Sequence, residues 1–282
     1  MRTSLFCLLL IGLINSNALA DERMPVRVMS YNIRYLNTRD GADIWRHRSE
    51  KVIETLAQTD LFGLQEATFP QIQDVAAGLP GFRYYGVGRD DGKQKGEATP
   101  IFYRTALFEE LKRGTFWLSP TPEVVGEAGW DAALPRIASW MTLKHRPSGK
   151  MLLIVNTHFD HKGKQARLES ARLLAEKSPT LAGESPIPLI VMGDFNTVRG
   201  SQPYEVLAEA DGWEDSYHST QTKPTGPQGT FNGFKAIQPD KHIDHIFVSE
   251  GTNVLSHQVL DPRTESGRFA SDHHPILIQL GL

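Results

Sequence analysis

The segment Ile187-Pro188-Leu189-Ile190-Val191-Met192-Gly193-Asp194-Phe195-Asn196-Thr197 is a short apolar run that ends in polar side chains. An apolar run bounded by proline and glycine is typical of a strand covered on both faces, and α/β proteins bind ligands beyond the carboxyl ends of such strands. Because side chains alternate along a strand, we expect Asp194 and Asn196 to point the same way. The carboxylate could then act as a base or metal ligand, and the amide could bind an oxyanion. An Asx turn that caps the next segment is the alternative interpretation.

The start of the chain has the pattern of a secretory signal peptide. It contains a positive charge at Arg2, an uncharged apolar core over residues 5–14 and a small-residue pattern that ends at Ala20. We therefore predict a signal peptide over residues 1–20 and one domain over residues 21–282, secreted or periplasmic after cleavage near Ala20. No later stretch approaches the ~18 apolar residues of a membrane helix, so we expect no stable membrane insertion. We also expect a monomer.

Composition excludes several classes of protein. The single cysteine, Cys7, lies in the predicted signal peptide, which excludes disulfides, thiol catalysis and cysteine-bound zinc from the mature chain. The 30 basic and 33 acidic residues give a net charge of −3, which does not indicate a polyanionic partner.

Apolar alternation predicts many short strands separated by turn-rich stretches. The expected strands cover residues 26–32, 61–66, 83–87, 98–104, 138–146, 151–157, 187–194, 242–248, 254–260 and 274–280. The expected helices lie near residues 43–56, 70–79 and 164–182. An irregular loop rich in Pro, Gly and Trp is expected over residues 117–134 and could border a cleft. The mixture of hairpins and crossovers favours two packed mixed sheets with helices outside.

Histidines gather near aspartates at the predicted strand ends. Six of the ten histidines fall in three short stretches, namely His158 and His161, His242 and His245, and His273 and His274. Each stretch also contains an aspartate, which gives the acid-imidazole pairs from which general acids and bases are built. One such pair is weak evidence, but three pairs that converge with Glu66, Asp194 and Asn196 indicate a catalytic site.

The order of the motifs adds a family resemblance. The motifs are Ser30-Tyr31-Asn32, Leu64-Gln65-Glu66, Asn156-Thr157-His158, Gly193-Asp194-Phe195-Asn196, Ile243-Asp244-His245-Ile246 and Ser271-Asp272-His273-His274-Pro275. Together they resemble the endonuclease/exonuclease/phosphatase superfamily, which includes DNase I and the CCR4-type deadenylases. The resemblance spans Val26 to Leu280 and implies an α/β (α+β) fold, a four-layer αββα sandwich of two mixed β-sheets. It also implies divalent-metal hydrolysis of phosphate esters.

The resemblance implies a metal site made of oxygen ligands. Glu66 resembles the family's principal ligand for Mg²⁺ (or Mn²⁺), with Asn32 beside it and Asp272 near the metal, and oxygen ligands suit these hard ions. Arg34 stands two residues after Asn32, where several members of the family have an acid, so we expect one ion and not two. Arg34 could instead clamp a phosphoryl oxygen of the substrate, or turn away to a surface salt bridge.

The resemblance also implies roles around the scissile phosphate. Asp194 resembles the residue that orients or deprotonates the attacking water, and Asn196 resembles the amide that binds a phosphoryl oxygen. Arg167 could reach a phosphate from its helix, although a structural salt bridge is the alternative.

Two imidazoles are expected to have different tasks. His273 resembles the imidazole that contacts the scissile phosphate, oriented by Asp244. His158 resembles a second imidazole that protonates the leaving oxygen, and Glu97 stands where DNase I has the carboxylate partner of that imidazole.

Competing functions stay open at this point. The segment Asn156-x-His158-x-Asp160-His161 is similar to the His-x-His-x-Asp-His signature of zinc hydrolases, with Asn in the first place. A secreted binding module that kept the fold and lost the chemistry is a second rival. The favoured function is a nuclease-like phosphodiesterase; a phosphomonoesterase or a phospholipid or sphingolipid phosphodiesterase is the alternative. Nucleic acid, a phospholipid and a small phosphodiester are the candidate substrates.

Cleavage of the predicted signal peptide can be tested by intact-mass spectrometry of the exported protein. We expect the mass of a chain that begins at Asp21, because the small-residue pattern ends at Ala20. Exported protein that still contains Met1 would contradict this expectation.

Overall fold

The computed structural model describes residues 25–183 and 187–282. The predicted signal peptide therefore lies outside the described residues. No helix in the described part of the chain is long and apolar enough to cross a membrane.

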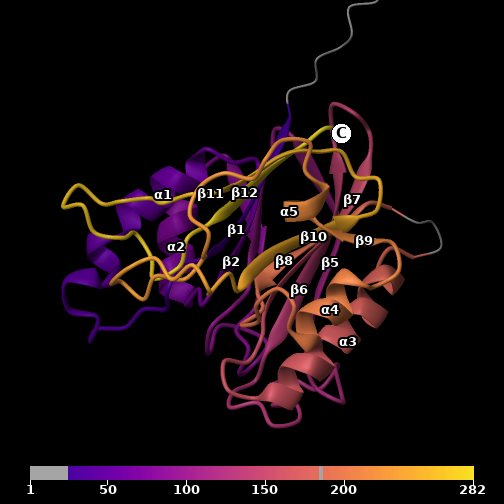
Figure 1. Cartoon of the computed structure of the whole chain (residues 1–282), viewed down its shortest axis with the longest axis horizontal. Helices are drawn as coiled ribbons and strands as arrows, with labels where there is room; N and C mark the ends of the chain where they lie inside the picture. The colour runs from indigo at the N-terminus through magenta and orange to yellow at the C-terminus, as the bar shows by residue number, and fades with distance from the viewer. Residues whose placement is uncertain (1–24, 184–186) are drawn as a thin grey trace, which may run out of the picture.

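Two six-stranded mixed sheets pack face to face (Figure 1). The first contains, in spatial order, β11 (Val254–Val259), β12 (Ile276–Leu280), β1 (Val26–Asn32), β2 (Leu61–Gln65), β4 (Ile101–Arg104) and β3 (Phe82–Tyr85). The second contains β5 (Phe108–Trp117), β6 (Ile137–His145), β7 (Met151–His158), β8 (Leu189–Asp194), β10 (Asp244–Ser249) and β9 (Trp213–Asp215). The pairs β1–β2 and β7–β8 are parallel, and the other paired strands are antiparallel.

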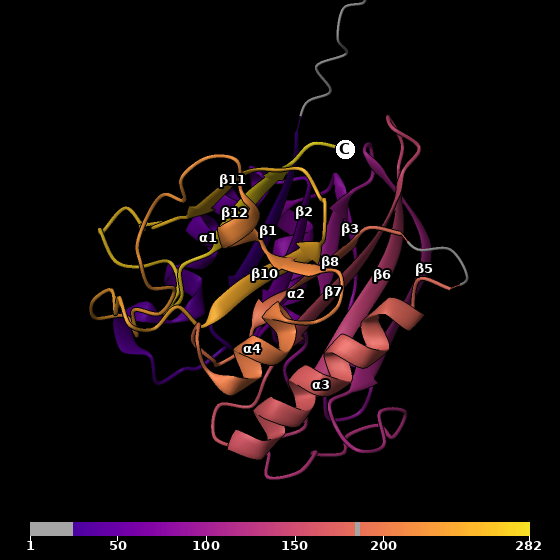
Figure 2. The ribbon, with the colours of Figure 1, turned by 45° about the vertical axis from the view of Figure 1, so that its right-hand side comes forward.

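Helices cover the outer face of each sheet. The helices are α1 (Ser49–Ala57), α2 (Phe69–Gly78), α3 (Lys164–Thr180), α4 (Gln202–Ala208) and the short α5 (Ser216–Ser219), with 3-10 turns at Gly41–Asp43 and Trp45–His47. Apolar side chains of α1 and α2 pack on the first sheet, and those of α3 and α4 pack on the second. Figure 2 shows α3 and α4 together on the second sheet. The predicted αββα sandwich is confirmed.

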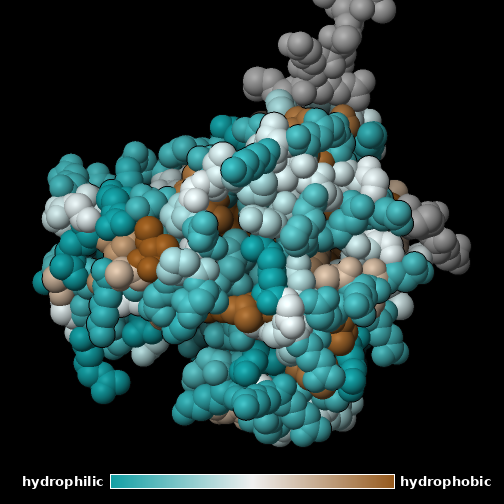
Figure 3. Space-filling model, in the orientation of Figure 1, coloured by the Kyte–Doolittle hydropathy of each residue, from teal (hydrophilic) through white to brown (hydrophobic). Residues whose placement is uncertain are grey.

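Strand alternation explains why the apolar run of β8 is buried on both faces. Ile190 and Met192 point into the core between the sheets, whereas Leu189 and Val191 pack under the helices. On the face drawn in Figure 3, hydrophobic areas are small and separated by hydrophilic side chains. Apolar side chains form three buried layers, one between the two sheets and one between each sheet and its helices. This arrangement matches a sandwich with two covered sheets.

Some elements differ from the sequence prediction. The ten-residue strand β5 was not predicted, because its sequence FEELKRGTFW carries several charges and lacks an apolar alternation. The strand lies at the edge of its sheet and contains a bulge, so these charged side chains are exposed. The helix α4 and the strand β9 were also missed. The predicted helix over residues 43–56 is wrong at its start, where two 3-10 turns precede α1.

A buried asparagine links the two sheets beneath their polar ends. Asn156 on β7 donates from Nδ2 to the carbonyl oxygens of Leu64 (2.8 Å) and Pro100 (3.0 Å), and its Oδ1 accepts from Gln65 Nε2 (2.7 Å). Gly63 provides the space, since a Cβ there would lie 2.5 Å from the Asn156 side chain. This set of bonds fixes the position of β2 relative to β7.

Replacing this link should destabilise the fold. Asn156→Leu removes the donor to the buried Leu64 carbonyl and the short bond to Gln65, so we expect the free energy of unfolding to fall by about 2 kcal/mol or more, measured by urea denaturation. Thr142→Val is the matched control, because the buried Thr142 hydroxyl has no hydrogen-bond partner and its loss should change stability by less than about 1 kcal/mol. Equal losses in both variants would show that the link is not important for stability.

Candidate active site

Most of the residues singled out in the sequence line one cavity of about 680 Å³. Its lining combines the ends of both sheets and includes Arg34, Glu66, Glu97, His158, Asp194, Asn196, Asp272 and His273. The strand β10 runs antiparallel to β8 and begins where β8 ends, so Asp244 lies directly opposite Asp194. A larger surface cavity of about 880 Å³ lies at the edge strands β3 and β5 and contains none of these residues.

Oxygen atoms suited to a metal ion crowd the end of the first sheet. Asn32 Nδ2 donates to Glu66 Oε1 (3.2 Å), and the backbone N–H of Tyr35 donates to Glu66 Oε2 (3.0 Å). Glu66 has a φ of +56°, which turns it out of β2 towards the cavity side. Burial raises the pKa of Asp272 to about 6; His273 and Arg34 act against this shift, and Glu66 adds to it. This crowding of carboxylates fits a hard divalent cation.

Arg34 forms the predicted salt bridge and also lies beside the acids of the site. It is held by Asp40, which accepts from Nε (3.0 Å) and Nη2 (3.1 Å), while Nη1 lies 3.7 Å from Asp272 Oδ2 and 4.0 Å from Glu66 Oε2. Strand alternation does not carry it there, because β1 ends at Asn32 and Arg34 has a φ of +58°. The salt bridge and the position beside the acids therefore coexist.

Asp194 is both a turn residue and a member of the site. Its Oδ1 accepts from the backbone N–H of Asn196 (2.9 Å), and its Oδ2 accepts from Asn32 Nδ2 (2.9 Å). Burial, followed by the charge of Asp244, raises the pKa of Asp194 to about 7 against the lowering effect of His273. A carboxylate with this pKa is well matched to proton transfer near neutral pH.

The side-chain amide of Asn196, which follows Asp194 in this turn, is bound to other groups of the protein. Asn196 has a φ of +49°, so strand alternation does not continue through this residue, although Asp194 and Asn196 both line the cavity. Asn196 Nδ2 donates to the carbonyl oxygen of Phe159 (3.1 Å) and lies 3.2 Å from His158 Nε2. Both hydrogens of the amide are thereby used, and His158 Nε2 is the acceptor.

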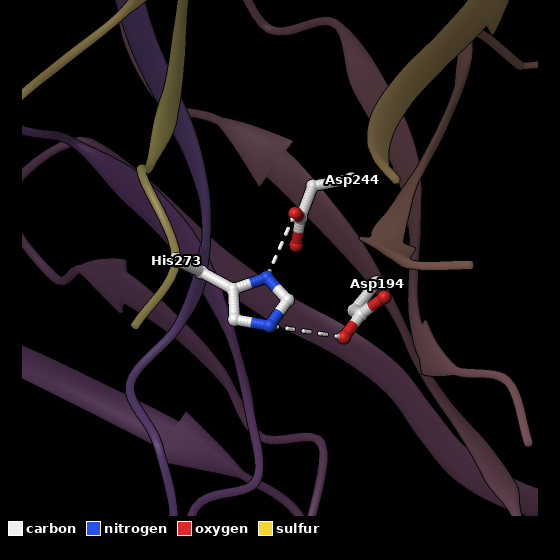
Figure 4. A group of neighbouring side chains, drawn as sticks. All are labelled: Asp194, Asp244 and His273. Carbon is white, nitrogen blue, oxygen red and sulfur yellow. Dashed lines mark hydrogen bonds and ion pairs between the residues drawn. The ribbon is translucent and has the colours of Figure 1, made fainter. Parts of the chain in front are cut away.

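His273 is held between two aspartates (Figure 4). Its Nδ1 donates to Asp244 Oδ2 (2.9 Å), and its Nε2 lies 3.7 Å from Asp194 Oδ2. Burial disfavours the imidazolium, but Asp244 and Asp194 outweigh it and hold the pKa of His273 well above its usual value. These three residues are also close enough to hold a metal ion in place of the proton.

His158 has the opposite electrostatic setting. Burial, followed by the charges of Arg136 and Arg89, holds the pKa of His158 well below its usual value. The predicted hydrogen bond to Glu97 is not formed, because His158 Nδ1 lies 3.8 Å from Glu97 Oε2 and Arg89 binds both Glu97 oxygens at 2.8 and 2.9 Å. The free protein thus has one charged imidazole, His273, and one neutral imidazole, His158.

Two arginines differ from the sequence prediction, one that was expected in the site and one that was missed. Arg167 does not line this cavity; its Nη1 donates to the carbonyl oxygen of Asp160 (2.9 Å). Arg136 was missed, although it lines the cavity and contacts Asp160 Oδ2 (3.3 Å) and His161 Nδ1 (2.9 Å). No spacing signal marks Arg136 in its irregular loop. Arg136 engages both Asp160 and His161, which argues against their joint use as zinc ligands with His158.

The two mixed sheets bring carboxylates, an amide and imidazoles together at their adjoining ends, a combination suited to hydrolysis. A model of the Endonuclease/Exonuclease/phosphatase family matches residues 29–273, and the chain belongs to this family of metal-dependent hydrolases.

Known proteins of similar structure cover nearly the whole chain. The chain is 40% identical to a mannosyl-6-phosphatase of Bacteroides thetaiotaomicron, over 91% of this chain and 100% of that one, with a TM-score of 0.85. A family member from Bacteroides vulgatus is 39% identical over 92% and 100% of the two chains, with a TM-score of 0.86. The human Nocturnin catalytic domain is 21% identical over 92% and 93%, with a TM-score of 0.70, a likeness in fold alone.

The chain spans less than half the length of the curated relatives that it matches. An uncharacterised protein of Acanthamoeba polyphaga mimivirus is 26% identical over 89% of this chain and 42% of its own length. The carbon catabolite repressor protein 4 homologue 1 of Arabidopsis thaliana is 26% identical over 43% of this chain and 21% of its own length.

Replacing the buried carboxylate should separate chemistry from folding. Asp194→Asn keeps an acceptor for Asn32 but cannot take a proton, so we expect kcat to fall by about 100-fold or more. The melting temperature should change little, because the removal of a buried charge offsets the loss of one of the two hydrogen bonds that the Asp194 carboxylate accepts. Hydrolysis of an aryl phosphate and a thermal melt check both, with Glu169→Gln on α3 as the control. Near-normal turnover would remove Asp194 from the chemistry.

Proposed function

We propose that this protein is a phosphomonoesterase that uses Mg²⁺ or Mn²⁺ to hydrolyse phosphorylated sugars. The observation that carries the proposal is the 40% identity, over 91% of this chain, to a protein named as a mannosyl-6-phosphatase. The cavity of about 680 Å³ supports it, because sites for small ligands have volumes of this order. Secretion or a periplasmic location is part of the same proposal.

The residues at the end of the first sheet would hold the ion. Glu66 and Asp272 offer carboxylate oxygens, and Asn32 offers Oδ1. When bound there, the ion would neutralise charge on the phosphoryl oxygens and on the departing oxygen. Arg34 is kept beside these acids by Asp40 and adds a fixed positive charge next to the phosphate.

The residues at the end of the second sheet would accept the proton of the attacking water and stabilise the negative charge of the phosphoryl group. Asp194, with its raised pKa, accepts the proton of the attacking water. The imidazolium of His273 faces the same cavity and stabilises negative charge that develops on the phosphoryl group. His158 is neutral in the free protein, so it acts as leaving-group acid only after the bound phosphate dianion raises its pKa.

The rim of the cavity suits a small ligand with both polar and apolar faces. Tyr35, Leu134, Val198 and Phe231 line it together with Lys241, whose ammonium lies 5.0 Å from the centre of the Phe231 ring. Aliphatic and aromatic side chains can pack on the C–H faces of a sugar while the charged groups reach its phosphate.

A phosphodiesterase, the function that the order of the sequence motifs favoured, is the second candidate. Because the two functions share the same catalytic groups, substrate tests must distinguish them. We would assay chelator-treated protein, with and without added Mg²⁺ or Mn²⁺, against mannose 6-phosphate, a phosphodiester dinucleotide and a short oligonucleotide.

The proposal expects metal-dependent phosphate release from mannose 6-phosphate with a kcat/KM at least about 100-fold above that for either diester. Asp194→Asn, prepared in parallel, controls for contaminating phosphatases. Faster hydrolysis of the diesters would establish the second candidate, and activity that persists without metal would contradict both.

A further inference from the structure

A second cavity of about 520 Å³ adjoins the active site. The two cavities share Asn196 and Val198 in their walls. The second cavity is formed by the first turns of α3 and α4 and by the loop that follows β8. A group attached to the substrate could therefore extend from one cavity into the other past Val198.

The described walls of this second cavity carry positive charge without any carboxylate. Lys164 and Arg167 contribute the charges, and Gln165, Ser201 and Gln202 contribute neutral polar groups. Arg167 makes one hydrogen bond to the protein, from Nη1 to the carbonyl oxygen of Asp160. Among the described residues, nothing accepts from its Nε and Nη2 or from Lys164 Nζ.

Other cations of α3 are paired, which makes this pair of charges unusual within the same helix. Arg172 Nη1 contacts Glu169 Oε1 (2.8 Å), and Lys177 Nζ contacts Glu123 Oε1 (2.9 Å). The amides at the start of α3 do not form the site, because Asp131 already accepts from the N–H groups of Gln165 (3.3 Å) and Ala166 (2.6 Å). The free positive charge therefore resides in the two side chains.

Arg167 is tied closely to the catalytic turn. Its Nη1 binds the carbonyl oxygen of Asp160, and Asn196 Nδ2 binds the carbonyl oxygen of the preceding residue, Phe159. The guanidinium is thus anchored at the neighbouring peptide, with two nitrogens left for a ligand. Guanidinium and ammonium groups without internal acceptors are suited to phosphate or carboxylate oxygens.

We propose that Lys164 and Arg167 form a second anion subsite, which selects substrates that carry another negatively charged group beyond the scissile phosphate. This inference rests on the proposed phosphomonoesterase function and narrows its substrate class to sugars with two anionic groups, of which a sugar bisphosphate is the simplest. The scissile phosphate would bind in the first cavity at Asp194 and His273. The second anionic group would bind in the second cavity, beyond Val198, at the start of α3.

The test compares two substrates that differ only in the second phosphate. Glucose 1,6-bisphosphate and glucose 6-phosphate are assayed with wild-type protein, Lys164→Gln, Arg167→Gln and the double variant, and Arg172→Gln is the matched control on α3. We expect the wild type to prefer the bisphosphate by about tenfold or more in kcat/KM, mainly through KM. The double variant should lose this preference, and Arg172→Gln should keep it.

Binding measured without turnover separates failure of this inference from failure of the proposed function. In the Asp194→Asn background, calorimetry should show tighter binding of the bisphosphate than of the monophosphate, and Arg167→Gln should remove the difference. If neither sugar is hydrolysed, the proposed function fails and calorimetry decides the subsite. Equal affinities for the two sugars, or equal losses for both in Arg167→Gln, would overturn the subsite and leave Arg167 a structural role at Asp160.

Discussion

One hydrogen bond joins the two sheets at the centre of the active site. Asn32 at the end of β1 donates from Nδ2 to Asp194 at the end of β8 (2.9 Å), and the same nitrogen lies 3.2 Å from Glu66 Oε1. A single buried amide therefore orients both the predicted base and the predicted metal ligand. This works only if the sheets keep a fixed spacing, which the core between them and the bonds of Asn156 provide. Buried hydrogen bonds in a low-dielectric interior are strong and directional enough for this task.

The charges around this bond divide the site into two halves. His273 is stabilised as a cation by the aspartates on β8 and β10, whereas His158 stands near Arg89 and Arg136 and stays neutral. Burial is similar for the two imidazoles, so the sign of the neighbouring charges decides the direction of each pKa shift. Carboxylates from β2 and the loop before β12 crowd on the other side, where Arg34 offsets part of their repulsion.

Local sequence was sufficient to predict the parts of the structure that depend on neighbouring residues. The apolar run of β8 predicted a doubly covered strand, and the pattern of hairpins and crossovers predicted two packed mixed sheets. The four-layer sandwich was implied by the family resemblance of the motifs. The turn at Asn196 follows the local bond to Asp194 that the Asx-turn alternative anticipated, but the bond of its side chain to the distant carbonyl of Phe159 was not predictable. The partner of Glu97 was missed for a similar reason. Glu97 forms a bidentate salt bridge with Arg89 and not the predicted contact with His158, and no motif marks this salt bridge. The strand β5 was missed because an exposed edge strand needs no apolar alternation.

In the proposed function, the end of the first sheet binds the metal ion and the end of the second sheet carries out the proton chemistry. Anomalous diffraction from crystals of the protein soaked in Mn²⁺ tests this assignment most directly, because it locates the ion without reference to activity. We predict a peak within bonding distance of Glu66, near Asp272 and Asn32, with His273 still hydrogen-bonded to Asp244. A peak among Asp194, Asp244 and His273, the other group of residues able to hold an ion, would contradict the account.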